Sequence, residues 1–76
     1  MYNASTLRAL GIGESARVLE ISGAGDSRRL ADIGLVPGTE VRCLLRAPCG
    51  EPTAYCIRGA VMALRDEDAE RVAVEP

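Results

Sequence analysis

Three cysteines are the residues in this chain best suited to metal or redox chemistry: Cys43, Cys49 and Cys56. Thiolates bind zinc and ferrous iron, but three of them need a fourth ligand to complete a tetrahedral site. No Cys-x-x-Cys pair and no histidine accompanies them. An odd number of widely spaced cysteines is also untypical of a disulfide-stapled secreted domain. We therefore predict reduced thiols and no metal site.

Two other patterns could bind ions or phosphates. Gly23-Ala24-Gly25 precedes a predicted helix start with Arg28 and Arg29, as in some phosphate sites, but the third glycine of a dinucleotide fingerprint is missing. The acidic run 66–70 lacks the central glycine of a calcium loop. We interpret the first as a strand-to-helix turn and the second as a solvated turn, and predict no cofactor.

Missing residue types narrow the function classes further. The chain of 76 residues has no histidine, and all nine of its Lys+Arg positions are arginine. The commonest general base and the lysine of Schiff-base and P-loop chemistry are thus absent, which argues against an enzyme. The net charge of -2 and only two tyrosines as aromatic residues argue against nucleic-acid binding. No apolar stretch approaches the ~20 residues of a membrane span, and no signal peptide is recognisable, so we expect a cytoplasmic protein.

With these function classes disfavoured, the sequence favours a protein whose surface binds another protein. Arg28, Arg29, Arg46 and Arg58 could form a basic patch for an acidic partner, because the guanidinium fork makes bidentate bonds to carboxylates. The alternative is scattered surface charge. The run 35–37 could add an apolar docking patch, or Leu35 could belong to the core.

The first half of the chain predicts a turn, a strand and a helix. Ser5 would cap a short turn that carries Leu7 and Leu10, and residues 14–22 read as a strand with a bulge where the apolar phase switches. Asp26 would cap a helix over 27–33, with Leu30 and Ile33 on its inner face. Gly34 would then close this helix in a left-handed conformation.

The second half predicts strands joined by tight turns. Pro37-Gly38 suits a type II turn before a strand over 39–46 that points Val41, Cys43 and Leu45 inward. A stiff loop over 47–52 leads to strands over 53–58 and 61–65, then Asp66 would cap a short acidic turn, and Val72 and Val74 end the chain as a strand. Five short strands and one helix favour a closed or nearly closed barrel, in a single domain over 1–76.

The run RRLADIGLVPGTEV at residues 28–41 resembles the signature of the ferrous iron transport protein A family, FeoA. The opening LRALGIGE at 7–14, the loop APCGEP at 47–52 and the segments at 58–59 and 63–65 are also similar to that family, in order and at its spacing. The resemblance implies a mainly β, SH3-like barrel with one short inserted helix and a short C-terminal helical turn. A related barrel ends the iron repressors of the diphtheria-toxin-repressor type.

The resemblance also implies a non-enzymatic, cytosolic accessory role in ferrous iron uptake beside FeoB, a membrane transporter with a GTPase domain. It assigns no obligatory metal ligand, so the thiol roles stay open, with Cys49 standing where an apolar residue is usual. We expect docking through Arg28, Arg29, Leu35, Val36, Pro37, Arg46, Pro48 and Arg58. The alternative is a metal-responsive or transcription-regulator-like binding domain, and since small barrels often pair, a homodimer stays open.

Overall fold

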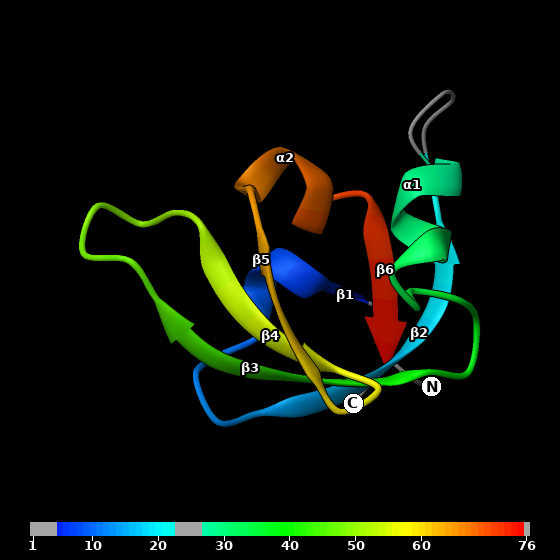
Figure 1. The fold of residues 1–76 in the computed structure, drawn as a ribbon, viewed down its shortest axis with the longest axis horizontal. Coiled ribbons are helices and arrows are strands. Elements are labelled where there is room, and N and C mark those ends of the chain that lie inside the picture. Colours follow the sequence, from blue (N-terminus) through cyan, green and yellow to red (C-terminus); the bar gives the residue numbers. More distant parts are fainter. Residues whose placement is uncertain (1–4, 23–26, 76) are drawn as a thin grey trace.

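The computed structural model describes residues 5–22 and 27–75, and of residues 27–29 the backbone only. Its elements follow in the order β1 (Ser5–Thr6), the 3-10 helix η1 (Leu7–Ala9), β2 (Ser15–Ile21), α1 (Ser27–Asp32), β3 (Glu40–Arg46), β4 (Thr53–Ile57), β5 (Ala60–Leu64), α2 (Asp66–Ala69) and β6 (Val72–Glu75). Figure 1 shows both α-helices on the same side of a strongly bent sheet, with the β3–β4 loop projecting at the end away from α1.

All strands form one antiparallel sheet in the order β1-β6-β2-β3-β4-β5. The mainly β prediction is confirmed. The expected five strands were one too few, because the two-residue β1 also pairs with β6, with Ser5 opposite Val74. Of the expected alternatives, a closed or a nearly closed barrel, full closure is wrong: β1 and β5 are the two edges of the described sheet, and they do not pair with each other.

Two bulges bend the sheet around the core. The first falls in β2 between Val18 and Glu20, where the change of apolar phase predicted it. The second falls in β3 between Cys43 and Leu45 and was not predicted. It shifts the alternation by one residue, so Leu45 is 59% exposed instead of pointing inward with Val41 and Cys43.

The core fills the concave face of the sheet and is covered by the short helices. Its members are buried apolar residues from every element longer than two residues: Leu7, Ala16, Val18, Leu30, Leu35, Val41, Cys43, Tyr55, Ile57, Leu64, Ala69, Val72 and Val74. Burial of each large aliphatic side chain contributes about 1.5–3 kcal/mol. Leu30, Ile33 and Leu35 attach the segment around α1 to the sheet, since the first and last are buried and Ile33 packs against them.

The C-terminal end of α1 is a Schellman motif, which confirms the role predicted for Gly34. The Leu35 N–H donates to the Leu30 carbonyl at 3.1 Å, and the Gly34 N–H donates to the Ala31 carbonyl at 2.9 Å. Gly34 has a φ of 107°, which a residue with a Cβ rarely adopts. The Pro37-Gly38 turn is also confirmed, closed by the Thr39 N–H on the Val36 carbonyl at 3.0 Å.

Three predicted helix starts need comment. Ser5 caps nothing: it lies in β1, and Thr6 precedes η1 without a side-chain capping bond. Asp66 is the first residue of α2 and not its cap, a position that Arg65 occupies. Asp26 lies outside the described residues, and α1 ends at Asp32, one residue before the predicted end.

Candidate functional site

The residues predicted to dock a partner separate into two regions. Val36 and Pro37 follow α1; Val36 is half-buried and Pro37 is exposed. Pro48 is also exposed, on the β3–β4 loop, which projects at the end of the molecule away from α1 (Figure 1). Leu35 is fully buried and contributes to the core. The side chains of Arg28 and Arg29 lie outside the described part of the chain, although α1 places their backbone at its first turn.

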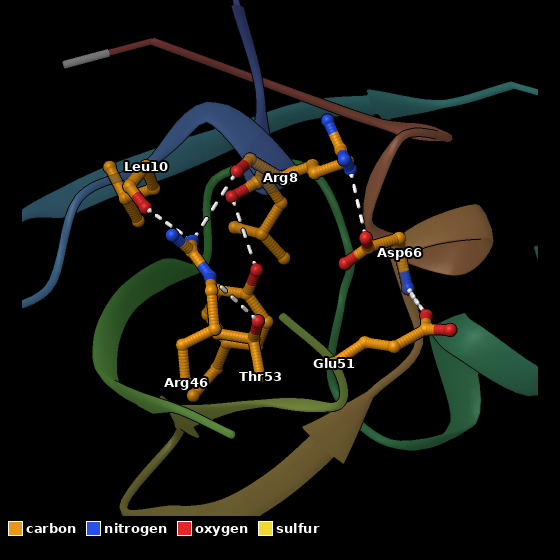
Figure 2. A network of polar contacts seen from close by, with 8 residues as sticks. Arg8, Leu10, Arg46, Glu51, Thr53 and Asp66 are labelled. Carbon is orange, nitrogen blue, oxygen red and sulfur yellow. Dashed lines mark hydrogen bonds and ion pairs between the residues drawn. The ribbon is translucent and has the colours of Figure 1, made fainter. Parts of the chain in front are cut away.

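Arg46 belongs to a structural network at the loop end of the sheet. Its Nε donates to the Thr53 hydroxyl at 3.1 Å, and its Nη2 donates to the carbonyls of Leu10 at 3.1 Å and Arg8 at 3.5 Å (Figure 2). A guanidinium has five N–H donors and suits such multiple acceptors. Arg46 therefore ties η1 and its following turn to the β3–β4 hairpin.

The same network continues to α2. Arg8 Nε lies 3.2 Å from Asp66 Oδ2, and the Asp66 N–H donates to Glu51 Oε1 at 2.9 Å (Figure 2). Beneath it, the buried Tyr55 hydroxyl donates to the Leu7 carbonyl at 3.2 Å. We call these contacts of Arg8, Arg46, Glu51, Thr53, Tyr55 and Asp66 the seam network, because they join η1, the hairpin and α2.

A second pair of arginines lines a hollow at the opposite end of β4. This arginine hollow has a volume of about 570 Å³ and is lined by Ser15, Thr39, Glu40, Arg42, Cys56, Arg58 and Gly59. Arg42 lies opposite Cys56 in the β3–β4 register, and Arg58 follows Ile57, the last residue of β4. Within the described residues neither guanidinium has an ion-pair partner. The hollow thus offers two charged forks and two hydroxyl groups to an anionic group, beside the single carboxylate of Glu40.

The structure brings Arg58 next to the segment after α1. A Cβ built on Gly34 would lie 2.9 Å from Arg58 Cδ and 3.2 Å from Ile57 Cγ2. Arg58 itself has a φ of 53° in the tight β4–β5 turn. Of the predicted docking residues, Arg58 therefore lies against the Gly34 turn that precedes Val36 and Pro37, whereas Arg46 and Pro48 belong to the other end of β4.

Sequence reasoning did not select Arg42 as a docking residue. The alternation of β3 places it on the outer face, but its partner there depends on register. Only the pairing of Arg42 with Cys56 brings it beside the β4–β5 turn and Arg58. The sequence signal that could have identified Arg42 was the presence of outward-facing arginines on neighbouring predicted strands.

The three thiols have different surroundings. Cys43 is buried opposite Tyr55, and burial raises the pKa of its thiol, with a smaller opposing effect from Arg46. Cys49 is exposed, and its Sγ–H donates to the Glu51 carbonyl at 3.0 Å. Cys56 is half-buried in the arginine hollow. Over residues 5–22 and 27–75, no three His, Cys, Asp or Glu side chains are grouped to hold a metal ion.

A small, bent antiparallel sheet with a helix inserted between β2 and β3 and a helical turn before β6 is an SH3-like β domain. The chain matches the FeoA domain over residues 5–76. It belongs to the FeoA family. No helix in the described part of the chain combines the length and apolarity needed to cross a bilayer.

Solved FeoA structures agree with this assignment. The chain is 38% identical to Stenotrophomonas maltophilia FeoA, with a TM-score of 0.82, over 91% of this chain and 87% of that one. That protein, solved with zinc, is described as an SH3 domain protein suggested to act as a bacterial ferrous iron transport activating factor. A FeoA-like protein from Clostridium acetobutylicum is 32% identical, with a TM-score of 0.90, over 99% of this chain and 88% of that one.

The same architecture occurs in larger regulators. A manganese-dependent transcriptional repressor is 26% identical, with a TM-score of 0.84, and the match covers 99% of this chain but 42% of the repressor. The predicted relation to iron-repressor barrels is confirmed at the level of the fold. No curated protein sequence shows a significant match to the chain.

Proposed function

We propose that this chain is a cytoplasmic regulatory factor of ferrous iron transport that acts by docking on the cytosolic part of a FeoB-type GTPase transporter. The observation that carries the proposal is the FeoA domain match over residues 5–76. The activating role suggested for the 38% identical Stenotrophomonas maltophilia protein gives it direction. The activity is binding and not catalysis, as expected for a chain that lacks histidine and lysine.

The arginine hollow is the proposed contact surface. Arg42 and Arg58 are exposed and have no carboxylate partner in the described residues, so both forks are available to an acidic segment of the transporter. The exposed Pro37 and half-buried Val36 follow the Gly34 turn that Arg58 covers, and they add apolar contact area. An apolar rim beside unpaired arginines is a common composition of binding surfaces.

Docking would regulate by differential affinity. If the surface of the transporter's GTPase domain changes with its bound nucleotide, a protein that binds one state more tightly shifts the population toward that state. A tenfold difference in affinity corresponds to about 1.4 kcal/mol of coupling free energy. This requires no chemistry from the FeoA chain itself.

A calorimetric titration with the transporter's separately produced cytosolic domain tests the proposal, in the GDP-bound and GTP-analogue-bound states. We expect binding that weakens with added salt and differs between the two states. Reversing both charges, with Arg42→Glu and Arg58→Glu, should weaken binding at least about tenfold. Arg65→Glu, an exposed arginine outside the hollow, is the matched control. No binding of the wild-type chain in either state would contradict the proposal.

The likeness to the manganese-dependent repressor favours a second candidate, a metal-responsive regulatory domain. Cys56 is the half-buried thiol nearest to an open surface, and it lines the arginine hollow. Titration of the reduced protein with Zn²⁺ and Fe²⁺ tests this alternative. Stoichiometric binding that Cys56→Ser abolishes would support it, and the absence of binding would remove it.

A further inference from the structure

Strand β5 leaves an unprotected sheet edge. It pairs with β4 alone, and its sequence, Ala60-Val61-Met62-Ala63-Leu64, contains no charge and no proline. Ala60, Val61 and Ala63 are exposed, with 67% of Val61 open to solvent. Natural edge strands are normally blocked by charges, proline, a bulge or a covering element, because an open edge is a template for another strand. β5 has none of the first three devices.

The β4–β5 turn fixes which backbone groups of β5 face outward. Arg58 and Gly59 form a two-residue turn with φ values of 53° and 84°, so the flanking pair of Ile57 and Ala60 is a hydrogen-bonded pair. Bonded and non-bonded pairs alternate along an antiparallel ladder. The N–H and C=O groups of Val61 and Ala63 therefore point away from β4, toward the open edge.

We propose that β5 pairs antiparallel with β5 of a second copy of this chain, about a two-fold axis at Met62. In this register Val61 lies opposite Ala63 of the second copy, and Ala60 lies opposite Leu64. Each small residue thus faces a larger one, and the two outward-facing residues of each strand form the hydrogen-bonded pairs. The interface is self-complementary, as a two-fold axis requires.

Charge selects this register over its neighbours. A slip of two residues in one direction places Leu64 opposite Arg58 of the second copy, and a slip in the other direction places Val61 opposite Arg65. The Met62-centred register keeps every pair within β5 uncharged.

A groove beside the same edge can receive the second strand. It has a volume of about 480 Å³ and is lined by Leu30 of α1, by Ile33 just after α1, by Met62 to Leu64 of β5, and by the polar residues Arg65, Glu67 and Asp68. The inward-facing Met62 of an added strand would extend the apolar inner face of the sheet beside this groove. Five paired residues make a small interface, so the dimer should be weak and reversible.

Sedimentation equilibrium over a concentration series, with a charge-swap design, tests the pairing. Wild type should shift reversibly from one to two chain masses between micromolar and millimolar concentration. Val61→Arg alone and Ala63→Glu alone should each abolish the shift, because each puts like charges diagonally across the two-fold axis. Mixing the two variants should restore it, since the new charges then lie directly opposite each other. Leu45→Arg, at a comparably exposed position outside β5, is the control that should still dimerise.

Restored association in the mixture cannot come from unfolding or from general apolar adhesion, so it supports both the edge and the register. A wild-type chain that stays monomeric to about 1 mM would overturn the proposal. Association lost in Leu45→Arg but kept in Val61→Arg would overturn it too, because the contact would then lie on another surface. A monomer that binds an unrelated extended peptide along β5 would equally reject self-pairing. None of these results depends on the transporter titration.

Discussion

Strand β4 begins beside one arginine and ends beside another, and the two are used differently. At its start, Arg46 donates to the Thr53 hydroxyl and to two backbone carbonyls of the N-terminal segment. At its end, Arg58 extends over Gly34 and lines a hollow with Arg42, and neither of these arginines has a carboxylate partner among the described residues. From the sequence alone, Arg46 and Arg58 are equally good candidates for a residue that binds a partner.

The difference shows that exposure does not identify a binding arginine. Arg46 is exposed, yet its N–H groups already donate to acceptors that would lose these hydrogen bonds if the guanidinium moved away. The seam network contributes to stability, and the arginine hollow is free to contribute to binding. Substitutions should therefore separate into those that lower stability and those that lower affinity.

The largest effect should come from the core beneath α1. Leu30→Ala removes a side chain that is 1% exposed and should lower the free energy of unfolding by about 2–5 kcal/mol, through lost burial and a cavity. Leu45→Ala, at an exposed position beyond the β3 bulge, is the control and should change it by less than about 0.5 kcal/mol. Urea denaturation measures both. Equal losses would mean that the bulge does not turn Leu45 outward.

Gly34 ends α1 and also lies against Arg58 of the arginine hollow, so a substitution there affects both the fold and the hollow. Gly34→Val should lower the free energy of unfolding by about 1–3 kcal/mol through backbone strain alone, because a β-branched residue is strained at a φ of 107°. The new Cβ would also crowd Arg58 and Ile57.

Gly38→Val is a control that separates strain from crowding. Gly38 has a φ of 93° and nothing within 4 Å of an added Cβ, so it should show the strain alone and a smaller loss. Thermal melts of both variants measure the difference. A Gly34→Val protein as stable as wild type would mean that the Schellman motif is misplaced.

Tyr55→Phe should have a smaller effect that depends on pH. At neutral pH it removes the hydrogen bond to the Leu7 carbonyl and should cost about 1 kcal/mol. Burial raises the pKa of Tyr55 above its ordinary value of 10.0. The unfolded chain thus loses this proton at a lower pH than the folded chain does, and wild-type stability falls as pH rises above 10.0.

The variant lacks that ionisation, so its stability should fall less steeply in this range. The contribution of Cys43, whose pKa burial raises above 9.0, remains in both proteins. Urea midpoints at about pH 7 and about pH 10.5 give the comparison. Parallel losses in wild type and variant would contradict the assignment to Tyr55.

The smallest effect is expected at the outer part of the seam network. The side chains of Arg8 and Asp66 are 53% and 29% exposed, so solvent screens their ion pair. Arg8→Ala should lower the free energy of unfolding by less than about 1 kcal/mol and by less still in high salt. A double-mutant cycle with Asp66→Asn measures the pair. A coupling energy well above that bound would show that the ion pair, and not the carbonyl contacts of Arg46, dominates the network.

Much of the fold could be predicted from local chemistry. Gly34 and Pro37-Gly38 specify backbone conformations that few other residues adopt, and alternation placed most core residues of β2 and β6. The β3 bulge could not be predicted in this way, because Leu44 and Leu45 are both apolar and either could have continued the inward phase. Closure of the barrel depends on how far the edges diverge, which local patterns do not encode.

The candidate site was less predictable because it depends on register and on competition for donors. Arg42 lines the candidate hollow because it pairs opposite Cys56, and Arg46 joins the seam network because the carbonyls of Arg8 and Leu10 lie within reach. Leu35 could be resolved only by its burial. Each of these outcomes joins segments that are far apart in the sequence.

The most direct test measures stability and transporter binding together for Arg46→Gln and Arg58→Gln. Arg46→Gln should lower the free energy of unfolding by about 1–2 kcal/mol and leave the Kd for the transporter's cytosolic domain unchanged. Arg58→Gln should leave stability unchanged and raise that Kd about tenfold. If Arg46→Gln instead weakened binding as much as Arg58→Gln and cost no stability, the division between the seam network and the arginine hollow would be wrong.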